Sequence, residues 1–128
     1  MDTCNRLARG KLAEEAACRF LQKRGLRLLT QNYRCQYGEI DLIMQSKENE
    51  VVFVEVRSRS STAYGTAAET IGPRKRAKIV RSALYFLQSK NWLNHINSRF
   101  DVIAIHFLQN DIQFDWIKNA FGIDETDY

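Results

Sequence analysis

The sequence GEIDLIMQSKENEVVFVEVRSR, residues 38–59, decides the fold because it predicts two adjacent β-strands joined by a short polar loop. Residues 38–44 alternate imperfectly between polar and apolar side chains, and residues 51–56 are rich in β-branched residues, as strands are. Residues 45–50 are polar and short enough to connect the two strands as an antiparallel hairpin. We therefore expect a hairpin here, with the other elements arranged around it.

Side chains on a strand alternate between its two faces, so this hairpin is expected to gather its charged residues on one face. The opposite face is then apolar. The charged face carries Glu39, Asp41, Phe53, Glu55, Arg57 and Arg59, and the other carries Ile40, Leu42, Val52, Val54 and Val56.

The register of the hairpin decides which charged residues meet across the strands. With the loop centred near Glu48, Asp41 lies opposite Glu55. The same register places Glu39 opposite Arg57, and a slip of one residue destroys both pairings. Two carboxylates then sit roughly 5 Å apart, which like-charge repulsion disfavours and a hard cation such as Mg²⁺ or Mn²⁺ relieves. The alternative is a surface hairpin whose carboxylates pair with the arginines of the second strand.

Length and composition predict a single cytoplasmic domain over residues 1–128 without membrane contact. The chain is 45% hydrophobic and 11% aromatic, and it has neither a long apolar run nor a signal-peptide pattern. Its three cysteines are widely spaced without a nearby histidine, which predicts reduced thiols rather than disulfides or a zinc site. The acidic residues 122–128 are expected to fray.

The net charge of +4 is unevenly distributed along the chain. Residues 51–81 hold seven Lys/Arg and two Glu, whereas residues 100–128 hold one Lys and six acids. A basic central region favours contact with a polyanion such as nucleic acid. The alternative interpretation is an ordinary solvated charge run.

The rest of the chain predicts two helices and three further strands. Residues 6–24 have helical apolar spacing and are followed by Gly25, a residue typical of the position just past a helix end. Glu14 lies in this helix, where a solvated glutamate is the ordinary interpretation. A strand at 26–33, a loop at 60–72, a helix at 73–90 and strands at 100–106 and 112–117 complete the order αβββαββ, a mixed α/β fold.

The second predicted helix has a basic face. Arg74, Lys78 and Arg81 lie at steps of four and three, opposite the apolar stripe. Lys75 adds to the helix start, whose partial positive charge has the same sign. Such a row can follow a phosphate backbone, and five basic residues in eight positions exceed what solubility requires. A solvated polar face is the alternative.

The chain resembles the YraN family of endonuclease-like bacterial proteins almost end to end. The resemblance implies a restriction endonuclease-like core, a mixed β-sheet flanked by helices of the PD-(D/E)xK type, similar to archaeal Holliday junction resolvases. It also implies that the partner is nucleic acid, with DNA as the main candidate, and is compatible with a homodimer. The matching motifs are NYRCQYGEIDLI (32–43), VVFVEVRSR (51–59), IGPRKRAKI (71–79) and SRFDVIAI (98–105), with Gly10, Glu14 and the pair Tyr64 and Gly65.

The resemblance also implies roles for individual residues. In that superfamily an acid on one strand and a D/E-x-K motif on the next bind magnesium and cut a phosphodiester bond. Asp41 matches the first acid, Glu55 the second, and Arg57 the position of the lysine. Glu14 matches the helix glutamate that resolvase-like members add. We expect metal ligation by Asp41, Glu55 and Glu14, support of Arg57 by Glu39, and nucleic-acid contacts by Arg59, Arg74, Lys75, Lys78 and Arg81.

Two departures from the family pattern bear on activity. The family's GxxGE motif has Ala13 in place of its second glycine. Arg57 replaces the lysine, and because arginine stays protonated it can hold a phosphate or stabilise negative charge but cannot take up a proton. We therefore expect either a Mg²⁺-dependent endonuclease whose metal activates the water, or a nucleic-acid-binding module that keeps the fold without cutting. A third interpretation is a protein-interaction subunit whose basic face contacts an acidic partner.

Overall fold

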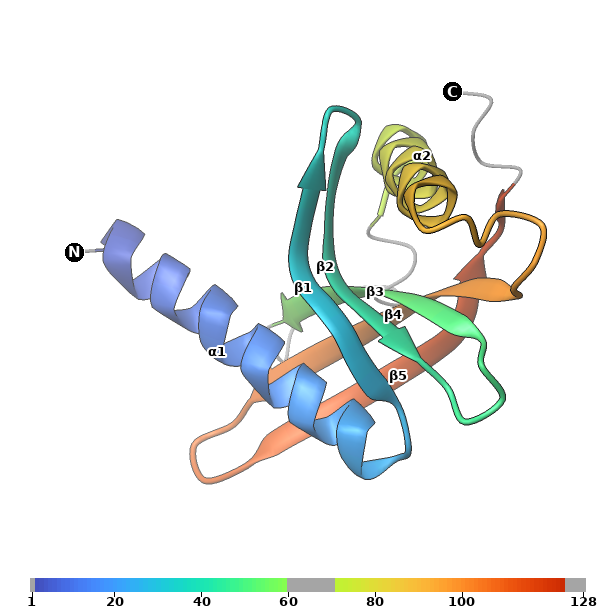
Figure 1. The fold of residues 1–128 in the computed structure, drawn as a ribbon. Helices are drawn as coiled ribbons and strands as arrows, with labels where there is room; N and C mark the ends of the chain where they lie inside the picture. The colour runs from blue at the N-terminus through green and yellow to red at the C-terminus, as the bar shows by residue number, and fades with distance from the viewer. Residues whose placement is uncertain (1, 60–70, 124–128) are drawn as a thin grey trace.

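The computed structural model describes residues 2–59 and 71–123, with only the backbone described for residues 2–9 and 59. The predicted order of one helix, three strands, one helix and two strands is confirmed (Figure 1). Most of the expected loop over residues 60–72 lies outside the described residues, and so does the pair Tyr64 and Gly65. The same is true of most of the acidic tail, residues 122–128. The elements are α1 (Asp2–Lys23), β1 (Arg27–Cys35), β2 (Gly38–Gln45), β3 (Val51–Arg59), α2 (Pro73–Ser89), β4 (Ser98–Phe107) and β5 (Ile112–Phe121).

The five strands form one mixed sheet in the order β1-β2-β3-β4-β5. Strands β3 and β4 are parallel, and the other three neighbouring pairs are antiparallel. Helices α1 and α2 lie on opposite faces of the sheet, so each face has its own apolar core (Figure 1). The expected α/β class, a mixed sheet flanked by helices, is therefore confirmed.

Helix α1 ends where the sequence predicts. Gly25 has a φ of 97°, a left-handed conformation that glycine adopts without steric cost. Its N–H donates to the carbonyl of Gln22, and the N–H of Leu26 donates to the carbonyl of Leu21, each at 3.1 Å. This is the Schellman arrangement, in which Leu21 and Leu26 are also buried together. It turns the chain from α1 directly into β1.

Helix α2 begins at Pro73, whose fixed φ suits a first helical turn. Its apolar residues, among them Ile79, Val80 and Phe86, are buried against the sheet. Arg74 and Lys78 lie on the exposed face. The sequence therefore predicted both faces of this helix correctly.

The hairpin departs from the predicted alternation at Asp41. We expected Ile40 and Leu42 on the same face, but Ile40 packs in the core under α2 and Leu42 in the core under α1. In β1, the neighbouring strand, Asn32 has a left-handed φ of 52°. Strand β1 also carries a register shift between Leu28 and Thr30. The alternation rule holds only for a regular strand, and it fails here where the pairing of β2 with β3 ends, at Leu42 and Val54.

Neither of the helices in the described part of the chain is long and apolar enough to cross a lipid bilayer.

Candidate functional site

Asp41 and Glu55 come from adjacent strands and lie opposite each other. Strands β2 and β3 pair Leu42 with Val54, and continuing this register by one residue brings Asp41 opposite Glu55. The Glu55 carboxyl lies within hydrogen-bonding reach of the Asp41 carboxyl. The observed pairs from Leu42–Val54 to Gln45–Val51 have the predicted register, and the carboxyls of Asp41 and Glu55 lie close together.

The Asp41 carboxylate marks the point where β2 and β3 separate. Pairing of the two strands ends at Leu42 and Val54, and the N–H of Val56 donates to Asp41 Oδ2 at 2.8 Å. A side-chain oxygen thus replaces the carbonyl that would continue the ladder. This bond fixes one oxygen of Asp41 beside β3.

Glu55 is a buried acid with incomplete hydrogen bonding. Its side chain is 4% exposed, and among the described residues its Oε1 has no hydrogen-bond partner. Burial raises the pKa of Glu55 well above its usual value, and the adjacent Asp41 raises it further. Lys75 and, to a smaller extent, Arg57 act in the opposite direction. Without a cation, Glu55 is therefore expected to hold a proton at pH values where an exposed glutamate is ionised.

Glu14 lies beside this pair on helix α1. Its pKa is raised first by burial and then by Asp41, whereas a hydrogen bond with Asn32 lowers it. Across the described residues, however, no three His, Cys, Asp or Glu side chains are arranged to hold one metal ion. The structure therefore brings Asp41 and Glu55 together, and places Glu14 next to them without completing a three-carboxylate set.

The predicted basic residues divide into two groups. Lys75, in the first turn of α2, and Arg57, on β3, act electrostatically on Glu55. Arg74, Lys78 and Arg81 lie on the exposed face of α2. The side chain of Arg59 falls outside the described residues, although its backbone pairs with His106 of β4.

Glu39 forms an ion pair that was not predicted. The β2–β3 ladder ends at Leu42 and Val54, before the Glu39 and Arg57 positions. Arg34 Nε donates to Glu39 Oε2 at 3.1 Å. Because both side chains are more than half exposed, this ion pair contributes little to stability.

Asn32 is a site residue that the sequence reasoning missed. Its side chain bonds to Glu14, and it lies between the cross-strand pairs Gln31–Leu42 and Tyr33–Ile40, opposite Asp41. Its left-handed φ of 52° is a conformation that asparagine tolerates better than most residues. One asparagine in a strand-like segment gives no signal of this kind, although Asn32 opens the motif NYRCQYGEIDLI.

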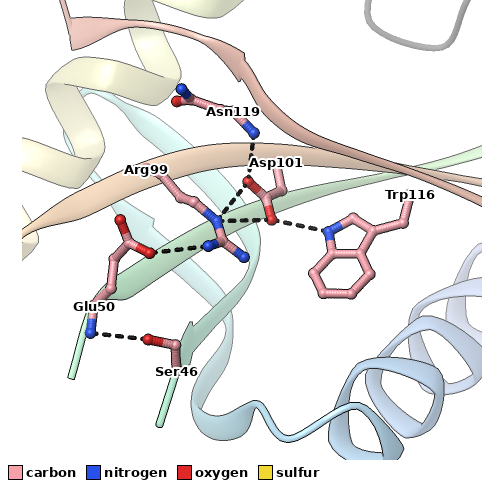
Figure 2. Close-up of polar contacts among 6 residues, drawn as sticks. All are labelled: Ser46, Glu50, Arg99, Asp101, Trp116 and Asn119. Atoms are coloured by element: carbon pink, nitrogen blue, oxygen red, sulfur yellow. Dashed lines mark hydrogen bonds and ion pairs between the residues drawn. The ribbon is translucent and has the colours of Figure 1, made fainter. Parts of the chain in front are cut away.

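Asp101, on β4, was also missed, and its surroundings contrast with those of Glu55. The carboxylate is fully buried and accepts hydrogen bonds from Trp116 Nε1 and the Asn119 N–H at 2.9 Å and from Arg99 Nε at 3.1 Å (Figure 2). Arg99 also donates to Glu50 at 2.9 Å. Asp101 is thus a satisfied acid that fixes β5 against β4 at an irregular step of their pairing.

A separate cavity of about 450 Å³ lies between β1 and the end of α2. It is lined by side chains that include Tyr33, Phe86 and Trp92. None of its lining residues belongs to the carboxylate pair. The candidate chemistry is therefore not located in this cavity.

The donor set at the carboxylate pair fits a hard divalent cation. Carboxylate and carbonyl oxygens are the ligands that Mg²⁺ and Mn²⁺ prefer. The buried Oε1 of Glu55 has no protein partner among the described residues, and a second carboxylate lies beside it. A buried acceptor of this kind is costly unless an ion or a proton satisfies it.

Comparison with known proteins relates most of the chain to one family. Residues 13–105 match the family described as "Uncharacterised protein family UPF0102". A UPF0102 protein of Syntrophus aciditrophicus is 43% identical, covering 91% of each chain, and one of Ectopseudomonas mendocina is 47% identical, covering 88% of this chain and 92% of its own. The solved structure of Pyrococcus furiosus SfsA in complex with Ca²⁺ is 10% identical with a TM-score of 0.39, covering 89% of this chain and 63% of its own, a likeness too weak to carry an argument.

Proposed function

We propose that this chain, which belongs to the family UPF0102, the YraN family that its motifs resemble, hydrolyses phosphodiester bonds in nucleic acid with the help of a metal ion. Its carboxylate pair, Asp41 and Glu55, would carry out this reaction. The observation that carries the proposal is the buried Oε1 of Glu55, which lies beside the carboxylate of Asp41 and has no partner in the described part of the chain.

Asp41 and Glu55 would hold Mg²⁺ or Mn²⁺, with the carbonyl of Val56 as a further oxygen donor. Such a cation lowers the pKa of its bound water and neutralises charge on the phosphate. Asp41 is held in place by the Val56 N–H, so one ligand is oriented in advance. Glu55 must lose its proton to bind, so metal binding is expected to release a proton and to strengthen as the pH rises.

The surrounding residues would position the substrate. Glu14 and its partner Asn32 flank the pair and would order a metal-bound water. Lys75, on α2, influences Glu55 more than Arg57 does, and we assign to Lys75 the contact with the scissile phosphate that the missing lysine would make. Arg57 would stabilise developing negative charge.

Cleavage of labelled DNA tests the proposal directly. Wild-type protein is incubated with linear and branched DNA in Mg²⁺ or Mn²⁺, beside Asp41→Asn and Glu55→Gln. Each substitution is expected to reduce the cleavage rate at least about a hundredfold, because it removes a ligand of the group that stabilises the transition state. Glu48→Gln, in the exposed β2–β3 loop, is the matched control and should cleave as the wild type does. Equal cleavage by wild type and Asp41→Asn would remove Asp41 from the chemistry.

A second candidate is a nucleic-acid-binding module that does not cut, and Arg57 in place of the lysine favours it. Calorimetric titration with Mn²⁺ separates the two functions. No heat of cation binding, together with salt-sensitive DNA binding, would support the non-catalytic module. Cation binding that is lost in Asp41→Asn would support the nuclease.

A further inference from the structure

Two exposed tyrosines meet where the β1–β2 turn touches helix α2. Tyr37 and Tyr85 are each 41% exposed, and their ring centroids are 5.8 Å apart with the ring planes at 63°. The turn is held against the helix at Gly38, where an added Cβ would lie 3.3 Å from Ser82 Oγ and 3.4 Å from Lys78 Cβ. Gly38 has a φ of 153°, so the close approach and the backbone both favour glycine. The β1–β2 turn that carries Tyr37 is therefore held close to α2, beside which it lies in Figure 1.

The tyrosine pair lies on the basic face of α2. This helix contains five Lys/Arg and no Asp/Glu. Arg81 and Lys78 are exposed one and two turns before Tyr85, respectively, and Lys75 lies a further turn back, close enough to Glu55 to oppose the rise in the pKa of Glu55. At 1.5 Å per residue, Lys75 and Tyr85 are about 15 Å apart along the helix. A row of cations thus leads from the carboxylate pair to the tyrosines.

A positive row that ends in exposed aromatic rings matches the chemistry of a single-stranded nucleic acid. Lys and Arg follow the phosphates, and aromatic rings stack on bases without regard to sequence. A paired duplex keeps its base faces stacked on one another, so it can use the cations but not the rings. The rings therefore add affinity only where bases are unpaired.

We propose that Tyr37 and Tyr85 form a stacking platform for an unpaired base, whose strand runs along Arg81 and Lys78 toward Asp41 and Glu55. The occupant is a single-stranded segment of nucleic acid, either free or part of a branched molecule. What happens at the carboxylates rests on the proposed nuclease function. The stacking itself does not require cleavage.

The test measures binding without cleavage. A fluorescent oligothymidylate, the matching oligouridylate and a blunt DNA duplex of the same length are titrated in EDTA, with wild type, Tyr37→Ala and Tyr85→Ala. Each alanine variant is expected to weaken binding of the single strands about tenfold, which corresponds to about 1.4 kcal/mol. Duplex affinity should change less than about twofold.

Three further variants separate stacking from charge and from the loss of any exposed ring. Tyr85→Phe keeps the ring and should bind as the wild type does. Tyr85→Lys adds a cation to a helix surface, so charge alone predicts tighter binding of single strands, whereas stacking predicts weaker binding. Phe107→Ala removes a ring of similar exposure at the end of β4 and should change nothing. Far-ultraviolet circular dichroism confirms that each variant is folded.

The outcomes separate this inference from the proposed function. Weaker single-strand binding by Tyr85→Ala and Tyr85→Lys, with the duplex unaffected, supports the platform whether or not the protein cleaves DNA. Loss on both strands is expected because they share the base face, and loss on one alone assigns the platform to that nucleic acid. If the tyrosine variants bind all three probes as the wild type does, or lose duplex and single strand equally, the platform is wrong even in an active nuclease.

Discussion

Asp101 and Glu55 are both buried acids, yet their surroundings differ in almost every respect. Asp101 is fully buried and accepts hydrogen bonds from the indole of Trp116, the N–H of Asn119 and the guanidinium of Arg99 (Figure 2). Glu55 is 4% exposed, faces another carboxylate, and has a buried oxygen without a partner among the described residues. Asp101 is thus satisfied by the protein itself, whereas Glu55 is not.

The difference shows which buried charge is retained for stability and which costs stability. A buried acid that is fully hydrogen-bonded rigidifies its surroundings, and removing it leaves several donors unsatisfied. A buried acid beside another acid destabilises the fold unless a proton or a cation satisfies it. Substitutions at the two positions should therefore change stability in opposite directions.

The largest expected effect is at Asp101. Asp101→Ala leaves Arg99 Nε, Trp116 Nε1 and the Asn119 N–H without their acceptor, and should lower the free energy of unfolding by about 3–5 kcal/mol. Urea unfolding measures this change. Asp115→Ala, on the exposed face of β5, is the matched control and should stay within about 0.5 kcal/mol of the wild type. Equal changes in the two variants would contradict a structural role for Asp101.

Glu55→Gln should have the opposite sign. In EDTA at pH 8 it is expected to raise the free energy of unfolding by about 1–3 kcal/mol, since a neutral amide avoids the cost of burying a carboxylate, or of protonating one, beside Asp41. The pKa of Glu55 in the folded protein is raised above its usual 4.5, so the folded state binds the extra proton between these values. The contribution of protonated Glu55 to the free energy of unfolding is therefore complete below pH 4.5. It is lost as the pH rises through the raised pKa.

This pH dependence gives the comparison a second measurement. Urea unfolding of wild type in EDTA should show stability falling above pH 4.5, by at most about 1.4 kcal/mol per pH unit for this one group. Glu55→Gln should lack that contribution. If both proteins respond to pH in the same way, Glu55 does not titrate as its surroundings indicate.

A divalent cation bound at Asp41 and Glu55 should satisfy Glu55, much as hydrogen bonds satisfy Asp101, and so stabilise the folded protein. If Asp41 and Glu55 bind Mn²⁺ with a dissociation constant near 1 mM, 10 mM Mn²⁺ should stabilise the folded protein by about 1.4 kcal/mol. Thermal unfolding of wild type, Asp41→Asn and Asp101→Asn with and without Mn²⁺ measures this. Only Asp41→Asn should lose the response, and an undiminished response in that variant would place the cation elsewhere.

The smallest expected effect concerns one donor of the satisfied acid. Trp116→Phe keeps an aromatic ring but removes the N–H that donates to Asp101 Oδ2 at 2.9 Å. The free energy of unfolding should fall by about 1 kcal/mol, the usual contribution of one hydrogen bond. Trp92→Phe, whose indole makes no hydrogen bond to Asp101, is the control for general loss of a tryptophan. A cost equal to that of Asp101→Ala would show that Trp116 acts mainly through packing.

The sequence predicted the order of elements and the hairpin register for physical reasons that are visible in the residues. Gly25 terminates α1, and Pro73 begins α2, because each has a backbone preference that few other residues share. The register that joins Asp41 to Glu55 followed from the centre of the polar loop and the two-residue period of the strands. These are local rules, and they hold where the helices and strands are regular.

The features that were missed depend on contacts between distant segments. Ile40 changes faces where the hairpin becomes irregular, opposite the left-handed Asn32. Asp101 lies within an otherwise apolar strand, and its partners lie on β5 and at the start of β4. The ion pair of Glu39 with Arg34 follows from the β1–β2 register, which places these two residues opposite each other. No spacing rule contains such information.

The parallel seam between β3 and β4 has a consequence for the order of folding. It joins a meander of β1, β2 and β3 to the β4–β5 hairpin, and each of those halves has antiparallel neighbours connected by short turns. Closing the seam requires α2 and its flanking segments to loop back, an entropic cost that nearest-neighbour hairpins avoid. We therefore expect Asp41 to meet Glu55 early in folding, before Lys75 arrives with α2. Pulse-labelling hydrogen exchange should then protect the amide of Val56, which donates to Asp41, before that of Val51, which donates to the carbonyl of Asn97 across the seam.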